Sequence, residues 1–242
     1  MQNTNVAVSQ QKGGKNQALS APYVVQVRSK ELVTHDVLRI VTDKPSQYHF
    51  IPGQATEVAI NKEGWREEKR PFTFTSLPDE MHLEFTTKVY PAHNGVTNEL
   101  QHIQIHDELI IDEAFGTIQY KGEGVFIAGG AGATPFIAIF KQLEREQQVG
   151  HNKLIFANKT RADIIQERYF QELLGPNVIP ILSNEKTEGY AYGYITEAFL
   201  RAHIGSINQW FYLCGPEPMM EAVEAHLQSI GVKPGAIIKE QF

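Results

Sequence analysis

Two short segments carry residue types and a spacing that suit nucleotide binding. The first, Gly129-Gly130-Ala131-Gly132-Ala133-Thr134-Pro135, follows an apolar run and opens an amphipathic stretch. Glycines let a backbone approach phosphate groups, and the free N–H groups at a helix start favour an anion. The spacing differs from the common G-x-G-x-x-G pattern, and no lysine follows as in nucleotide-hydrolysing loops. We predict that a dinucleotide pyrophosphate binds at Gly129, Gly130, Gly132, Thr134 and Pro135.

The second segment is Arg70-Pro71-Phe72-Thr73-Phe74-Thr75-Ser76. A guanidinium group supplies two parallel donors that suit a phosphate. A neighbouring aromatic ring offers a face to a flat ligand, and the hydroxyl groups can donate hydrogen bonds. The same alternation is common in the wall of a β-barrel, and by itself this segment favours that structural interpretation over a ligand site.

Two further segments lie near the end of the sequence. Cys214-Gly215-Pro216 closes a predicted strand, and ligands of open parallel sheets bind at that edge. Alone, the thiol is best explained as a small buried side chain. Glu240-Gln241-Phe242 ends the sequence with an aromatic residue directly after a predicted strand. Neither segment indicates a function without the other two.

The composition excludes several classes of protein. Among 242 residues, 22 Lys and Arg face 28 Asp and Glu, and the net charge of −6 argues against a nucleic-acid partner. A single cysteine excludes a disulfide or a four-thiolate iron–sulfur cluster within this chain. The nine histidines show no ligand pattern, so we expect no metal. Without an apolar run of about 18–20 residues or an apolar N-terminal segment, we expect no membrane span and a cytoplasmic protein.

The hydrophobic pattern predicts the elements that would position these segments. Residues 1–21 are polar and are predicted to form a disordered tail. Six short alternating strands then predict a small antiparallel β-barrel, interrupted by one helical stretch from Val96 to about His102. The strands expected are Tyr23–Arg28, Val37–Thr42, Thr56–Ile60, Arg70–Ser76, His82–Val89 and Glu108–Ile111.

Strands alternate with helices in the second half, which predicts a parallel sheet covered by helices on both faces. Its first helix is expected over Thr134–Val149, with Thr134 as the N-cap and Gly150 at the end. The other elements expected are strands Val125–Ala128, Leu154–Ala157, Val178–Leu182, Trp210–Cys214 and Ala236–Lys239, and helices Gln166–Leu174, Thr196–His203 and Pro218–Ile230. We therefore predict a β-barrel domain over residues 22–121 and an α/β domain over residues 122–242.

Together the four segments resemble the signatures of the ferredoxin–NADP reductase superfamily of flavoprotein reductases. The resemblance runs from about Tyr23 to Phe242 and keeps the order of the motifs across two domains of the expected type. It implies a flavin-binding antiparallel β-barrel followed by an NAD(P)-binding parallel-sheet α/β domain, without an iron–sulfur domain.

On the flavin side, the resemblance implies that Arg70, beside Pro71, holds the flavin phosphate. Phe72 would pack against the isoalloxazine ring where most relatives have tyrosine, with the loss of one hydrogen bond, and Thr73 would donate near the reactive nitrogen. Further contacts are implied for Ser76, Lys88, Val89 and Tyr90, and for a helix start at Gly95, Val96 and Thr97. FAD is preferred to FMN through the resemblance alone.

On the nicotinamide side, Cys214 with Gly215 and Pro216 would lie beside the nicotinamide ring. Glu240 would be an acidic neighbour, and Phe242 would cover the flavin and move aside for the nicotinamide. Asn158, Lys159 and Thr160 would contact the cofactor where NADH and NADPH are distinguished, with a slight preference for NADH. The catalytic group implied is therefore Thr73, Cys214, Glu240 and Phe242.

The activity implied is hydride transfer from NADH or NADPH to FAD, followed by electron transfer to a separate acceptor. That acceptor could be ferredoxin, flavodoxin, a cytochrome or a small oxidant. An electron-transfer or regulatory subunit with little activity alone is a second interpretation. A flavin-free dinucleotide-binding protein is a third, and it leaves the Arg70–Ser76 segment unexplained.

Overall fold

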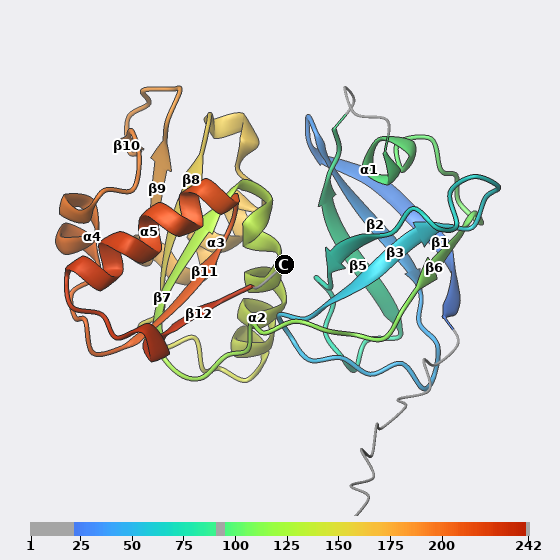
Figure 1. Ribbon diagram of the computed structural model, residues 1–242, viewed down its shortest axis with the longest axis horizontal. Helices are drawn as coiled ribbons and strands as arrows, with labels where there is room; N and C mark the ends of the chain where they lie inside the picture. Colours follow the sequence, from blue (N-terminus) through green and yellow to red (C-terminus); the bar gives the residue numbers. More distant parts are fainter. Residues whose placement is uncertain (1–21, 91–94, 241–242) are drawn as a thin grey trace, which may run out of the picture.

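Two six-stranded sheets lie side by side in the computed structural model, which describes residues 22–90 and 95–240 (Figure 1). The first sheet is antiparallel and the second is parallel with helices packed on it, so the predicted fold class is confirmed. The tail predicted over residues 1–21 and the predicted ring of Phe242 lie outside the described residues.

The antiparallel sheet closes into a barrel. Its strands follow the order β4-β3-β6-β1-β2-β5. The two end strands meet beyond β4, where Phe74 bridges to Phe85 and the N–H of Thr75 donates to the carbonyl of Glu84 at 2.8 Å. The strands are β1 (Tyr23–Thr34), β2 (Val37–Asp43), β3 (Ala55–Ile60), β4 (Arg70–Thr73), β5 (His82–Lys88) and β6 (Glu108–Ile111).

The single barrel helix, α1 (Val96–Glu99), is shorter than the stretch predicted to reach His102. It ends because the N–H groups of Gln101 and His102 bond to carbonyls three residues back, which tightens the chain into a turn.

The parallel sheet has the order β10-β9-β8-β7-β11-β12, and buried side chains cover both of its faces. Its strands are β7 (Gly124–Gly129), β8 (Lys153–Asn158), β9 (Val178–Leu182), β10 (Ala191–Tyr192), β11 (Trp210–Cys214) and β12 (Ile237–Lys239). Its helices are α2 (Thr134–Arg145), α3 (Glu167–Leu174), α4 (Glu197–His203) and α5 (Glu217–Ser229). Short 3-10 turns are η1 (Gly130–Ala133), η2 (Arg161–Asp163), η3 (Gly175–Asn177) and η4 (Pro234–Ala236).

The helix α2 begins at Thr134 as predicted, but its predicted N-cap and its predicted C-terminal end were wrong. Thr134 is not its N-cap, because η1 leads directly into the helix through Ala133 and the Thr134 hydroxyl donates to the Ala131 carbonyl at 2.9 Å. The helix ends at Arg145 rather than near Val149, since Gln147 adopts a left-handed conformation with φ 56° that a helix cannot continue.

The α2 helix faces the barrel and joins the two sheets through apolar and polar contacts (Figure 1). Val37 of β2 is buried in the same cluster as Phe136 and Phe140 of α2. Beside this cluster, the ammonium of Lys141 lies 3.0 Å from a carboxylate oxygen of Glu84 in β5. Burial of the Glu84 carboxyl opposes ionisation, but Lys141, Thr75 and Arg39 outweigh that effect and lower its pKa.

We expect Glu84→Gln to lower the free energy of unfolding at pH 7 by about 3–5 kcal/mol, because it leaves two cations around a buried neutral group. The folded-state pKa lies below the ordinary value of 4.5. The carboxylate therefore stabilises the fold above that value, and this stabilisation is lost as the pH falls through the folded-state pKa. Urea unfolding should show the difference between variant and wild type shrinking in acid.

A suitable control is Asp79→Asn, which breaks the exposed ion pair with Arg145. Exposed pairs contribute little, so this change should have a much smaller effect at every pH. A Glu84→Gln deficit that is the same at pH 7 and in acid would contradict the role of the ionised carboxylate.

Candidate functional site

The candidate site lies at the carboxyl edge of the parallel sheet, where the chain reverses its direction of travel across the sheet. Strand β7 is the first of this sheet in the sequence, and it pairs with β8 on one side and β11 on the other. Ligands of open α/β sheets bind at such a switch point. The loops that follow β7, β8 and β11 carry three of the segments singled out from the sequence, so the fold brings these segments together.

The loops after β7 and β11 touch through their backbones. A Cβ atom on Gly132 would lie 2.6 Å from the Cα of Gly215, and one on Gly215 would lie 3.0 Å from the nitrogen of Gly129. Packing between loops therefore already requires two of these glycines. Gly130 differs, because its φ is +52° and nothing lies within 4 Å of the position a Cβ would take.

The turn η1 and the helix α2 form one continuous helical segment, whose N-terminus lies at Gly130 because the Thr134 N–H already donates to the Ala131 carbonyl. Among the described residues, no side chain caps its first turn. The first N–H groups of a helix have no partner within it, and the helix dipole favours negative charge there. Together with the open space at Gly130, this arrangement can accept a phosphate group.

An unsatisfied amide marks the same edge. Asn158, the last residue of β8, is 7% exposed, and its Oδ1 and Nδ2 have no hydrogen-bond partner among the described residues. Strand β8 packs against η1, which is the glycine loop itself. Leaving a buried polar group unpaired costs about 1–3 kcal/mol. A ligand with its own donors and acceptors would satisfy the Asn158 amide.

The two residues that follow Asn158 differ from each other. The side chain of Lys159 is exposed, whereas the Thr160 hydroxyl donates to Asp163 at 2.7 Å in a capping box that fixes the loop. Lys159 is thus exposed, the Asn158 amide is unpaired but buried, and Thr160 shapes the loop.

Cys214 and Glu240 lie together in a buried corner of the structure. Burial, and then repulsion by Glu240, raise the pKa of the Cys214 thiol to about 12. Burial also raises the pKa of Glu240, against hydrogen bonds from the backbone of Thr117 and Ile118. At neutral pH the thiol is therefore protonated and serves as a packing surface rather than as a nucleophile.

Glu240 also reaches the segment that connects the two sheets. Its Oε1 accepts from the Thr117 N–H at 3.3 Å, and the Thr117 hydroxyl donates to the Lys239 carbonyl at 2.6 Å. Gly116 and Thr117 of this connecting segment were not among the site residues predicted from the sequence. The signal in the sequence is a glycine directly after Phe115. It lies a few residues before the pattern changes from short strands to strands that alternate with helices.

In the barrel segment, the predicted flavin residues are placed in different surroundings. Arg70 is exposed and Thr73 is half-buried, so both present polar groups at the surface. The Phe72 ring is 5% exposed and lies in the barrel core, 6.3 Å from the Phe85 ring, so it offers little face to a ligand in this conformation. Ser76 is buried, and its hydroxyl accepts from the Glu84 N–H at 3.0 Å. Pro71 is exposed.

The remaining predicted flavin contacts are at the end of β5 and at α1. The Lys88 ammonium lies 2.6 Å from a carboxylate oxygen of Asp36, and Val89 is buried, while Tyr90 is 45% exposed. Gly95 precedes the one-turn helix that contains Val96 and Thr97, and residues 91–94 lie outside the described residues.

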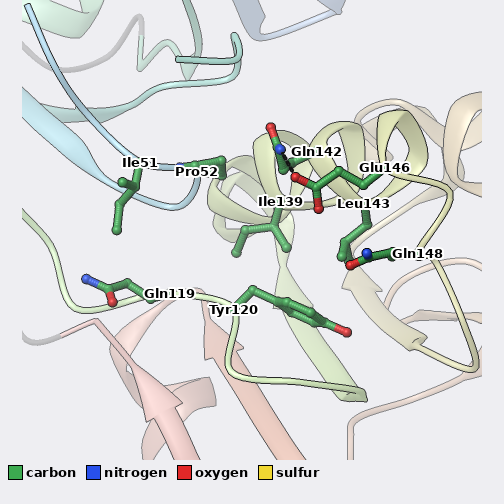
Figure 2. A pocket seen from close by; sticks show the side chains of 9 residues that line it. All are labelled: Ile51, Pro52, Gln119, Tyr120, Ile139, Gln142, Leu143, Glu146 and Gln148. Atoms are coloured by element: carbon green, nitrogen blue, oxygen red, sulfur yellow. Dashed lines mark hydrogen bonds between the residues drawn. The ribbon is translucent and has the colours of Figure 1, made fainter. Parts of the chain in front are cut away.

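A separate groove of about 210 Å³ lies between the two halves of the chain, beside the second half of α2. Figure 2 shows Ile51 and Pro52 from the barrel facing Ile139 and Leu143 of α2, with Tyr120 below them. Since none of the predicted site residues lines this groove, it is not part of the candidate site.

Comparison with known proteins gives consistent results. The family model for the oxidoreductase NAD-binding domain matches residues 126–225. The flavohem-like FAD/NAD-binding domain of Vibrio cholerae nitric oxide dioxygenase superposes with a TM-score of 0.80 at 21% identity, covering 92% of this chain and 99% of that one. A Neisseria gonorrhoeae ferredoxin NADP+ reductase with bound FAD and NADP superposes with a TM-score of 0.79 at 17% identity, covering 91% and 98%. The chain is therefore similar in fold to ferredoxin–NADP reductase-like proteins over most of its length.

Curated relatives of this chain are longer than it is. The reductase component of propane 2-monooxygenase from Mycolicibacterium goodii is 26% identical over 239 residues, which are 90% of this chain and 65% of that protein. The chain thus spans slightly less than two thirds of the length of such relatives. Among the described residues, no helix is both long and apolar enough to cross a bilayer.

We expect the Cys214 thiol of the protein to resist modification at neutral pH. With a pKa of about 12, only about one thiol in 10⁴ is ionised at pH 8. Ellman's reagent should therefore react slowly with the folded protein and fully once urea unfolds it. Rapid, complete labelling of the folded protein at pH 8 would show that the thiol is neither buried nor held neutral.

Proposed function

We propose that this protein is a flavoprotein reductase that oxidises NADH or NADPH and passes the electrons to a separate acceptor. The observation that supports it most directly is the buried, unpaired amide of Asn158 beside the open glycine loop. A dinucleotide carries phosphates, which suit the loop. It also carries hydroxyl and carboxamide groups, which could serve as the missing hydrogen-bond partners of the Asn158 amide. The similarity of the fold to ferredoxin–NADP reductase-like structures supports the same conclusion.

The residues present fit the two cofactors to different degrees. For the nicotinamide cofactor, Gly130 and the first N–H groups of η1 would hold the pyrophosphate, and Asn158 would orient a polar group of the ligand. For FAD, the Arg70 guanidinium would bind a phosphate and the Thr73 hydroxyl would donate to the ring. When bound, FAD would supply the chemistry that turns a two-electron donor into a source of single electrons or electron pairs.

The described part of the site contributes placement and a low dielectric rather than acid–base chemistry. Cys214 and Glu240 are both buried and shielded from water, and the raised pKa of the Cys214 thiol keeps that group neutral. Glu240 also ties β12 to Thr117, which fixes the junction between the two halves. Holding two reacting rings in place can lower a barrier by about 7–11 kcal/mol relative to free encounter.

The loop after β8 supports NADH as the preferred donor. The Arg161 guanidinium lies 3.3 Å from a Glu167 oxygen and 5.4 Å from the centre of the Tyr190 ring. The backbone N–H of Arg161 donates to a carboxylate oxygen of Glu185 at 2.9 Å. Glu167 thus pairs with the Arg161 guanidinium, and Glu167 and Glu185 would place two carboxylates near the extra phosphate of NADPH. Lys159 is also exposed, and among the described residues it makes no ion pair.

The separate acceptor is proposed from the relatives and not from a surface of this chain. Relatives are named as the reductase component of propane 2-monooxygenase, the electron transfer component of anthranilate 1,2-dioxygenase and an NADH-cytochrome b5 reductase. We propose a redox protein of that general kind, such as a ferredoxin, a flavodoxin, an oxygenase component or a cytochrome.

A flavin-free dinucleotide-binding protein is the second candidate function, because Phe72 is buried where a flavin ring would need a face. An absorption spectrum separates the two. We expect the purified or FAD-reconstituted protein to show flavin bands that bleach anaerobically, faster with NADH than with NADPH. A colourless protein that takes up neither FAD nor FMN would contradict the reductase and favour the second candidate.

We expect Arg70→Ala to weaken FAD retention about tenfold or more, since a charge-assisted phosphate contact contributes about 1.5–3 kcal/mol. Equilibrium dialysis followed by flavin fluorescence measures the retained FAD. Arg66→Ala is the matched control, because Arg66 is exposed and bonds to Asn61 outside the proposed site. Equal FAD retention in both variants would remove Arg70 from the site.

We expect Asn158→Leu to leave the free energy of unfolding unchanged or to raise it, because it removes an unpaired buried amide, and to weaken NADH binding at least tenfold. Urea unfolding and calorimetric titration with NADH measure the two effects. Asn152→Leu is the control, since Asn152 is fully buried and bonds to Gly124, Tyr120 and Val149. That variant should lose about 1–3 kcal/mol of stability. A destabilised Asn158→Leu with unaltered NADH affinity would show that Asn158 is structural.

A further inference from the structure

A line of contacts runs along α2 and β5, from the glycine loop to the far end of the helix. At one end β5 packs against η1. In the middle Lys141 meets Glu84, and past the start of β5 Arg145 of α2 pairs with Asp79. The helix that begins at the proposed pyrophosphate loop therefore lies along a strand of the barrel that carries the proposed flavin residues.

Lys141 makes the most enclosed of these contacts. Its ammonium donates to the Thr75 carbonyl at 2.7 Å and to the Glu84 carboxylate at 3.0 Å. The Glu84 side chain is only 4% exposed, whereas the side chains of Arg145 and Asp79 are 44% and 65% exposed. A shielded ion pair is weakened much less by water and salt than an exposed one.

On the barrel side, the Glu84 carboxylate is held in a fixed orientation. The Thr75 hydroxyl donates to it at 2.9 Å, and Arg39 of β2 donates through Nε at 2.7 Å. Arg39 in turn pairs with Glu31 of β1 at 2.7 Å. The ammonium of Lys141 therefore binds to a network of hydrogen bonds and ion pairs. Residues of β1, β2 and β5 and of the segment after β4 form this network and hold the carboxylate in place.

Directional contacts fix orientation in a way that apolar contacts do not. Val37 and the α2 rings would tolerate a small slide or rotation of the helix, because apolar contacts are non-directional. Two hydrogen bonds from one ammonium to Thr75 and Glu84 would break under the same motion. Lys141 thus determines where along β5 the helix sits.

We propose that Lys141 is a positioning residue, which sets the nicotinamide-binding half against the flavin-binding barrel so that the two cofactors meet in a reactive arrangement. The proposal rests on the proposed reductase function. Lys141 lies in the middle of α2, away from the glycine loop, so it acts through the helix and not through contact with either cofactor. A misplacement of about 1 Å can cost about a hundredfold in rate.

The first test uses the FAD-loaded protein and stopped-flow reduction by NADH. We expect Lys141→Met to lower the limiting rate of flavin bleaching about 10–100-fold, with FAD content and the apparent dissociation constant for NADH within about twofold of wild type. Lys141→Arg, which keeps a cation, should recover most of the rate. Arg145→Gln, which breaks the exposed pair on the same helix, should stay within about twofold.

The second test uses the cofactor-free protein. We expect amide hydrogen exchange in β5 and in α2 to accelerate together in Lys141→Met but not in Arg145→Gln, because the two elements lose their shared anchor. A wild-type protein that takes up no flavin would contradict the proposed function, and this exchange measurement would still decide whether Lys141 couples the halves.

Three results would overturn the positioning role. One is an unchanged limiting rate in Lys141→Met. Another is a loss confined to NADH affinity, which would place Lys141 in binding. The third is a Lys141→Arg variant as slow as Lys141→Met together with unchanged exchange in β5 and α2, which would show that the cation does not anchor the helix.

Discussion

The arrangement of the site depends on one close approach of backbone to backbone, between the loop after β7 and the loop after β11. Gly132 and Gly215 permit it, since a Cβ atom on either would meet main-chain atoms of the facing loop. This contact brings Cys214 beside η1 and leaves Gly130 facing open space. A larger side chain at either position would separate the loops, and the start of η1 would move away from the thiol and from Glu240.

The buried ionisable groups differ between the site and the interface that joins the two sheets. The corner formed by Cys214 and Glu240 is buried, and both groups have raised pKa values, which keeps the thiol neutral. The ionised, buried carboxylate belongs instead to Glu84 in the interface, where Lys141 and Arg39 compensate it. Strong directional electrostatics therefore hold the halves together, while the loops are left with main-chain donors and one unpaired amide to bind a ligand.

The positions of the four segments were predictable because they depend on local pattern. Apolar runs followed by glycine or by Cys-Gly-Pro indicated strands that end at a ligand-binding edge, and β9, β11 and β6 have the predicted bounds. The N-cap and the C-terminal end of α2 were not predictable in this way. A 3-10 turn precedes Thr134 where a cap was expected, and the left-handed conformation of Gln147 ends the helix early, although helix propensity would have allowed both the cap and the longer helix.

The sequence by itself determined the fold class, the order of the segments and the resemblance to a known superfamily, because hydrophobic periodicity and short glycine motifs are properties of neighbouring residues. Tertiary structure alone decided which of these side chains are buried and which have hydrogen-bond partners. It buried Phe72 in the barrel core, engaged Ser76 and Thr160 in structural hydrogen bonds, and left the Asn158 amide without a partner. It also paired Lys141 with Glu84 across 57 positions of the chain. Burial and partnership depend on residues distant in sequence, and no local pattern encodes them.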